Sequence, residues 1–346
     1  MTHSLLFAIL FHAIGAFCAS VCYTPQKKIV GWSWQTFWIM QAFFCWFLLP
    51  IVVAIITVPH IGLVLSEAPK SIMAGTFFMG AIYGIGGTTF AVAIRYIGYS
   101  LTYAIAVGLS AVLGTLIPPI ISGSFSELYH KVGFHWIIFG IVAGTLGIGV
   151  CGIAGFMKEK DSQKITPDNI PSAGKGLLLS VIAGFCSAVY GLALDFAKPL
   201  AIISENHGAG QYAGNIIYIF TNTGAFVTAA GYSLYLHRKH GTFSELINFS
   251  SSNLSRQNFN IFLSFVTGLL WYSQFFFYNL AHSRMLNYEF ISWAFHMIML
   301  VLFSKILGIL FKEWYHCEAK TKKVIYGGIA LLIFAILFLT YGTAQG

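Results

Sequence analysis

The segment Val324–Thr343 reads VIYGGIALLIFAILFLTYGT and contains no charged side chain. A helix needs about 20 apolar residues to cross a hydrocarbon core about 30 Å thick. The segment has this length, and a basic run that includes Lys320, Lys322 and Lys323 precedes it. We therefore predict a membrane-spanning helix here rather than a core helix of a soluble domain.

The composition of the whole chain extends this conclusion. Of its 346 residues, 57% are hydrophobic and only 9% are charged, whereas soluble domains carry about 25% charged residues. A surface so poor in charge could not be hydrated. The net charge of +8 does not indicate a nucleic-acid partner, because the Lys and Arg residues are scattered over short connections.

Nine further stretches of similar length and composition alternate with polar connections. Together with 324–343 they predict ten membrane-spanning helices, and hence an all-α polytopic membrane protein. The stretches are 4–23, 34–57, 71–94, 98–120, 134–156, 176–198, 212–236, 259–282, 287–311 and 324–343.

The ten predicted helices divide into five and five, with the polar segment 157–175 between them. An odd number of helices in each half turns the second half over relative to the first, as in many transporters. We therefore predict two inverted five-helix repeats, 1–156 and 176–346, joined by a linker at 157–175.

The distribution of Lys and Arg predicts the orientation in the membrane. The connections after the first, third, fifth, seventh and ninth predicted helices hold fourteen of these residues, and the opposite connections hold three. Positively charged loops stay in the cytoplasm. The linker is then cytoplasmic, and both termini are periplasmic.

His12 lies near the middle of the predicted helix 4–23, beside Gly15, Ala16 and Ala19. A polar side chain at membrane depth is costly, so it is a candidate functional group. The small residues could leave room for a ligand next to the imidazole. The alternative is a packing histidine whose polar atoms are paired inside the protein.

Four residues of the predicted helix 259–282 share one stripe, since Trp271, Gln274, Tyr278 and His282 follow helical spacing. An indole ring stacks on the apolar faces of a sugar, and an amide pairs with its hydroxyl groups. We interpret Trp271, Gln274 and Tyr278 as sugar-binding residues. The alternative is ordinary aromatic packing.

In the predicted helix 287–311, Glu289, Trp293 and His296 are spaced i, i+4 and i+7, which places them on one face. A carboxyl group that faces a low-dielectric cavity holds its proton more tightly than in water, so it can exchange one near neutral pH. Glu289 is therefore the first candidate for proton coupling, unless it is a solvated residue at the membrane rim. Asp195 is the second choice, although its spacing from Lys198 favours a local ion pair.

No pattern indicates a resident cofactor or a metal. The fingerprint G-x-G-x-x-G occurs at Gly147, Gly149 and Gly152, but within a predicted membrane helix and without the preceding strand that a nucleotide site requires. Small residues there favour close helix packing instead. His282 and His296 fall on different predicted helices, which disfavours haem. With no convergent catalytic cluster in the sequence, we predict that the chain is not an enzyme.

Several motifs together resemble a known family. They are FHAIG at 11–15, YTPQKK at 23–28, GAIYG at 80–84, WYSQFFFY at 271–278 and ISWAFHM at 291–297. The chain resembles the L-rhamnose–proton symporter family of the drug/metabolite transporter superfamily over nearly its full length.

The resemblance implies a protein of the bacterial inner membrane that imports L-rhamnose, a neutral 6-deoxyhexose, together with protons. It also implies functional roles for the matching positions, although Glu289 stands where family members carry Asp and Asp195 where they carry an amide. The partners would be the sugar, protons and the lipid bilayer. The matching positions are His12, Trp271, Gln274, Glu289, Trp293 and His296.

Two other functions remain open at this point. A metabolite or drug exporter of the same fold would show efflux without sugar-dependent proton uptake. A membrane-embedded enzyme would need an acid–base, nucleophile or metal cluster at the bilayer surface.

Overall fold

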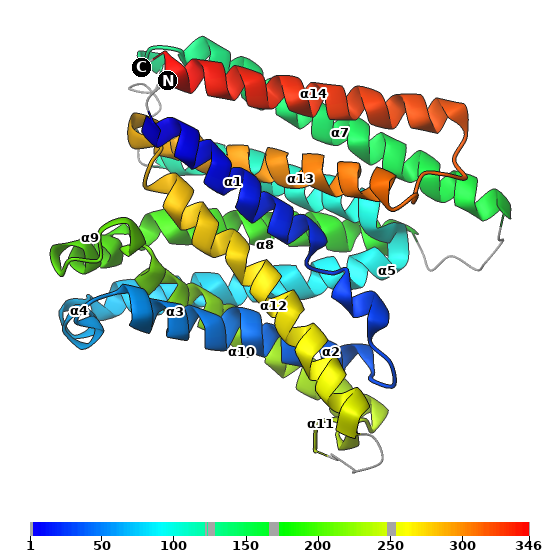
Figure 1. Ribbon diagram of the computed structural model, residues 1–346, viewed down its shortest axis with the longest axis horizontal. Coiled ribbons are helices and arrows are strands. Elements are labelled where there is room, and N and C mark those ends of the chain that lie inside the picture. Colours follow the sequence, from blue (N-terminus) through cyan, green and yellow to red (C-terminus); the bar gives the residue numbers. More distant parts are fainter. Residues whose placement is uncertain (1–2, 122, 124–128, 166–172, 248–253, 346) are drawn as a thin grey trace. The chain divides into compact units, whose positions relative to one another are not determined.

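The computed structural model describes residues 3–121, 123, 129–165, 173–247 and 254–345 (Figure 1). All regular structure within these ranges is helical. The α-helices are α1 (His3–Val21), α2 (Trp34–Ala42), α3 (Leu49–Thr57), α4 (Ile61–Glu67), α5 (Lys70–Ile121), α7 (Phe134–Ile165), α8 (Ala173–Phe196), α9 (Lys198–Asn206), α10 (Asn215–His240), α11 (Ser244–Ile247), α12 (Leu254–His282), α13 (Ser292–Leu310) and α14 (Ala319–Ala344). Three 3₁₀ turns are described, η1 (Pro25–Lys28), η3 (Gly210–Tyr212) and η5 (Leu286–Ile291), together with one π-helical segment, η2 (Phe43–Leu48).

Within the described residues, nine helical segments are long and apolar enough to cross a membrane. They coincide with nine of the ten predicted stretches, so the prediction of a polytopic α-helical membrane protein is confirmed. The two predicted helices 71–94 and 98–120 both lie in α5, which is interrupted at Gly98 by a backbone φ of 74°. Such a φ favours glycine, because a β-carbon would be strained there.

The tenth predicted stretch, 212–236, is helical as α10 but is not among the nine apolar segments. α10 is more polar than those nine segments because it contains Asn215, Thr221, Asn222 and Ser233. All four side chains are fully buried in the protein interior. Ten membrane-spanning helices therefore stay a prediction.

The chain forms two compact units. The first unit comprises Met1–Ser20, Gly86–Leu192 and Leu280–Gly346, and the second comprises Val21–Ile85 and Ala193–Asn279. The division falls within α1, α5, α8 and α12, and each unit draws on both halves of the chain. The division into inverted repeats at 1–156 and 176–346 stays a prediction. In the predicted linker 157–175, α7 continues to Ile165, and 166–172 lie outside the described residues.

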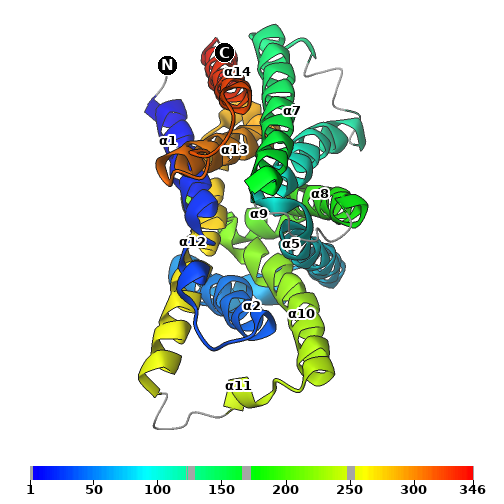
Figure 2. The ribbon, with the colours of Figure 1, turned by 90° about the vertical axis from the view of Figure 1, so that its right-hand side faces the viewer.

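In the first unit, α14 runs alongside α7 (Figures 1 and 2). The fingerprint glycines lie on α7, and a β-carbon added to Gly147 would come within 3.1 Å of side-chain atoms of Leu331 and Leu332 of α14. On α14 itself, a β-carbon at Gly328 would lie 2.7 Å from the sulfur of Cys151. The prediction of close helix packing is therefore confirmed at Gly147, whereas a β-carbon at Gly149 would meet no atom within 4 Å.

In the second unit, glycines bring α5 and α10 into close contact. A β-carbon at Gly80 would lie 1.9 Å from the backbone oxygen of Thr221, and one at Gly84 would lie 2.4 Å from that of Ala225. Gly224 of α10 approaches the backbone of α5 in the same way. Only glycine permits two helix backbones to approach this closely, as in other membrane proteins.

Candidate functional site

The residues singled out from the sequence fall into two sets, one in each unit. The first unit contains His12, Glu289, Trp293 and His296, and the second contains Asp195, Trp271, Gln274 and Tyr278.

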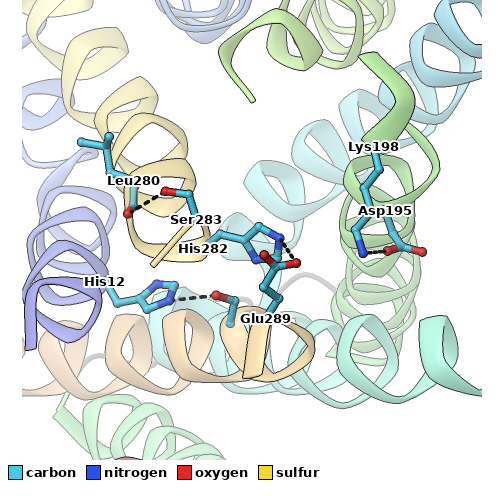
Figure 3. Close-up of polar contacts among 8 residues, drawn as sticks. His12, Asp195, Lys198, Leu280, His282, Ser283 and Glu289 are labelled. Carbon is cyan, nitrogen blue, oxygen red and sulfur yellow. Dashed lines mark hydrogen bonds and ion pairs between the residues drawn. The ribbon is translucent and has the colours of Figure 1, made fainter. Parts of the chain in front are cut away.

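His12 and His296 lie together in the first unit. Both rings are buried, and their centroids are 5.7 Å apart. His12 Nε2 lies 3.1 Å from the hydroxyl of Ser292, and Figure 3 draws this contact as a dashed line from His12. The His12 ring also stacks on that of Phe295, with 5.7 Å between the ring centroids. The His12 side chain thus connects α1, which carries it, to the first turns of α13. Ser292 belongs to this cluster too, but a lone serine carries no sequence signal that would single it out.

Trp293 is anchored within the first unit. Its indole N–H donates to the backbone oxygen of Ser110 at 2.9 Å, and the hydroxyl of Ser110 is 3.2 Å away. Space for the ring comes from Gly114, where a β-carbon would lie 2.5 Å from the indole nitrogen. Tyr190 flanks the ring at 6.2 Å. The hydrogen bond and the packing fix the orientation of this indole.

Glu289 differs from the sequence prediction. It lies in η5, a 3₁₀ turn that runs directly into α13 at Ser292, so its backbone is wound more tightly than the regular α-helix that the sequence predicted. That Glu289 shares one face with Trp293 and His296 stays a prediction. The backbone departs from helical geometry at Tyr288, whose hydroxyl donates to the backbone oxygen of Val132 at 2.8 Å. This bond holds the turn.

The turn presents the Glu289 carboxylate to His282, which ends α12. The distance from His282 Nε2 to Glu289 Oε2 is 3.7 Å, and the glutamate side chain is 43% exposed (Figure 3). A protonated imidazole would pair with the carboxylate at this distance. Glu289 is thus half-exposed next to a titratable partner, and sequence spacing did not predict this pair.

Asp195 forms the ion pair that its spacing predicts. Its Oδ1 lies 2.7 Å from Lys198 Nζ, with side-chain exposures of 44% and 53% (Figure 3). The pair bridges the end of α8 and the start of α9. The interpretation as a local i, i+3 ion pair is confirmed.

Trp271 lies in an aromatic cluster of the second unit. Its ring centroid is 5.1 Å from that of Trp46, 5.9 Å from that of Trp38 and 5.2 Å from that of Tyr23. All three contacts are edge to face, with interplanar angles of 63° to 73°. Aromatic rings prefer this geometry. Trp38 and Trp46 were not predicted as site residues.

A glycine brings α12 against the helix that carries Trp38 and Trp46. A β-carbon at Gly268 would lie 2.6 Å from the β-carbon of Phe44 and 3.1 Å from the backbone oxygen of Gln41. Trp271 follows one turn later on the same face of α12. The missing side chain at Gly268 therefore lets Trp271 reach the other two indoles.

The backbone beside this cluster is unusual, because η2 (Phe43–Leu48) is π-helical between α2 and α3. Short π-helical segments are frequent at functional sites. On α12, Gln274 and Tyr278 follow Trp271 at helical spacing, and both are largely buried. The predicted stripe of Trp271, Gln274 and Tyr278 is thus directed into the protein.

Comparison with known proteins places the chain in a family. A family model described as L-rhamnose-proton symport protein matches residues 1–345. Proteins named L-rhamnose-proton symporter from Citrobacter koseri and Klebsiella pneumoniae are 32% identical to the chain, and one from Escherichia coli is 31% identical. Each alignment covers the full length of both chains. The chain belongs to the L-rhamnose-proton symport protein family.

Membership confirms the resemblance read from the motifs and identifies this symport protein as a transporter and not an enzyme. The residues around Trp271 and around His12 are aromatic, amide, hydroxyl and imidazole groups. Among the described residues, no group of three or more His, Cys, Asp or Glu side chains could hold a metal ion.

Proposed function

We propose that the chain imports L-rhamnose together with protons by alternating access. The relatives bear this activity in their names and match along their whole length. The observation that carries the proposal for the chain itself is the Trp271 cluster, where aromatic rings and the Gln274 amide occur together at the middle of α12. A neutral deoxyhexose needs such apolar platforms and uncharged partners, whereas a phosphorylated solute would need an Arg or Lys clamp.

We assign the coupling proton to Glu289. In the outward-facing state its carboxyl group takes up a proton from the periplasm and loses its charge. In the inward-facing state the more alkaline cytoplasm withdraws the proton, and the affinity for the sugar falls, because the two ligands raise each other's affinity by the same factor. The neighbouring His282, a second titratable group 3.7 Å from the carboxylate, supports this assignment. Asp195 is the second choice.

His12, Trp293 and His296 are proposed as further substrate-binding residues. The imidazoles of His12 and His296 are buried next to each other, and the Ser292 hydroxyl lies beside His12. This group of polar side chains supports the proposal. Trp293 would contribute a ring face rather than a donor, since its N–H is bonded to Ser110.

For the topology, we propose ten membrane-spanning helices, with α10 as the helix beyond the nine apolar segments. They would form two inverted five-helix repeats in a bacterial inner membrane. The fourteen-to-three distribution of Lys and Arg supports cytoplasmic odd-numbered connections and periplasmic termini.

The experiment that tests the function uses a weakly buffered suspension of energised cells that produce the protein. L-Rhamnose should make the medium alkaline, and cells without the protein should give no response. Efflux of L-rhamnose without proton uptake would favour the exporter alternative. If a different sugar makes the medium alkaline and L-rhamnose does not, the proposed substrate is wrong and the chain imports that other sugar.

A further inference from the structure

The contact between α2 and α12 in the second unit contains polar atoms that the protein leaves unpaired. Both side-chain atoms of Gln41, Nε2 and Oε1, are buried and have no hydrogen-bond partner within the described chain. The indole N–H groups of Trp38 and Trp46 are likewise buried and have no hydrogen-bond acceptor within the described residues. All three side chains are 0% exposed.

Unpaired polar groups of this kind destabilise a protein. Each buried donor or acceptor without a partner loses its hydrogen bonds to water on folding and gains none in return. Gln41 is the one side chain in the described part of the chain in which two such atoms occur together. A role in packing would be served better by an apolar side chain of the same volume, so packing accounts for the indole rings but not for Gln41.

These groups surround the ring that the proposed function uses. Trp38 and Trp46 are 6.0 Å apart and both contact Trp271 edge to face. Gln41 lies one helical turn after Trp38, and its backbone oxygen faces Gly268, one turn before Trp271. The unpaired donors and acceptor therefore belong to the same contact between α2 and α12 as the aromatic platform.

The chemistry of these groups matches a hydroxylated ligand. An amide offers two donors and an acceptor, and an indole offers one donor. A sugar hydroxyl both donates and accepts, so a pyranose ring could pair all of them while its C–H faces contact the indoles. The groups are uncharged, which suits a neutral sugar.

We propose that Gln41, Trp38 and Trp46 are sugar-binding residues of this chain, pairing with hydroxyl groups of a neutral pyranose held against Trp271. This inference rests on the proposed function and extends it to α2. In the present conformation the indoles pack against one another. The bound sugar replaces part of these contacts, and the adjacent π-helical turn Phe43–Leu48 supplies the extra backbone residue that lets Trp46 adjust.

The test compares two Gln→Leu substitutions on the same helix. Gln41→Leu removes the unpaired amide. Gln35→Leu is the matched control, because Gln35 is also buried but its Nε2 donates to the hydroxyl of Thr242 at 2.9 Å. The full-length variants are purified, L-rhamnose affinity is measured by calorimetry, and the melting temperature is measured without sugar.

Gln41→Leu should bind L-rhamnose at least tenfold more weakly and melt at or above the wild-type temperature. Gln35→Leu should bind like the wild type and melt at a lower temperature. The two variants should therefore shift the melting temperature in opposite directions. A structural role for Gln41 would lower the melting temperature in both variants, whereas a binding role lowers it only in Gln35→Leu. Trp46→Phe, which keeps a ring but removes the N–H, should also weaken binding, and it decides the question if Gln41→Leu does not fold.

Two results would overturn the inference while the proposed function stands. One is wild-type affinity in Gln41→Leu or, where that variant does not fold, in Trp46→Phe. The other is a Gln41→Leu protein that melts below the wild type as Gln35→Leu does. A wild-type protein that binds no L-rhamnose would refute the proposed function itself, and the inference would fall with it.

Discussion

Replacing Glu289 by Gln removes one ionisable group and keeps the length and shape of the side chain. The carboxylate is 43% exposed, and the atom nearest to it in an ion pair is His282 Nε2 at 3.7 Å. Exposed pairs of this kind contribute about 0–1 kcal/mol to stability. The variant should therefore fold, and a transport defect in it would come from the lost proton site.

The size of the expected defect follows from the driving force. A proton that moves down a membrane potential of 100 mV releases about 2.3 kcal/mol. At about 1.4 kcal/mol for each factor of ten, one proton per sugar would sustain roughly 40-fold accumulation. Glu289→Gln resembles the protonated form permanently, so it should still bind L-rhamnose and exchange it across the membrane but reach a concentration ratio near one.

The assay measures uphill uptake and counterflow of radiolabelled L-rhamnose in proteoliposomes with an imposed potential. Asp195→Asn is the matched control, since Asp195 is a carboxylate of similar exposure in an ion pair with Lys198. It should accumulate sugar like the wild type. Wild-type uphill uptake in Glu289→Gln would refute the assignment, and loss of uphill uptake in Asp195→Asn would move the coupling role to Asp195.

Three further predictions concern sugar binding, pH and topology. Trp271→Ala should weaken L-rhamnose binding by roughly 1–2 kcal/mol, as expected for a ring that stacks on the sugar, and unchanged affinity would leave Trp271 with a packing role only. Burial alone would raise the pKa of Glu245, but hydrogen bonds from the hydroxyl of Thr36 and from the N–H and hydroxyl of Ser33 lower it overall. Because the folded-state pKa lies below the unfolded value near 4.5, this stabilisation is complete above pH 4.5 and is lost as the pH falls further. Glu245→Gln should accordingly lower the melting temperature at pH 7 but much less at pH 3. An alkaline phosphatase fused after Gly346 should be active, and an inactive fusion would exclude a periplasmic C-terminus.

The helices could be predicted from the sequence because their cause is local. Length and apolar composition determine which segments can cross a membrane, and α14 follows from this rule alone. The ion pair of Asp195 and Lys198 was predictable for the same reason, since i and i+3 side chains are neighbours on a helical turn. The close packing at Gly147 of α7 followed from the preference of membrane helices for small residues at their contacts.

The candidate site could be predicted only in part, because its contacts are distant in the sequence. Trp271 could be singled out on its own helix, but its contacts with Trp38 and Trp46 depend on how α12 packs against α2. The π-helical turn at Phe43–Leu48 has no periodic signature, so the helix was expected to be regular throughout. Glu289 was placed on α13 because spacing arguments assume a regular helix, and the 3₁₀ turn breaks that assumption.

The most direct test of the central claim measures both transported species at once. Purified protein is reconstituted in liposomes that contain a pH indicator, and L-rhamnose is added outside without any imposed pH gradient or membrane potential. Inward movement of the sugar should acidify the lumen, and a protonophore should abolish the acidification without stopping sugar entry. Sugar entry with no change in internal pH would contradict proton symport by this chain.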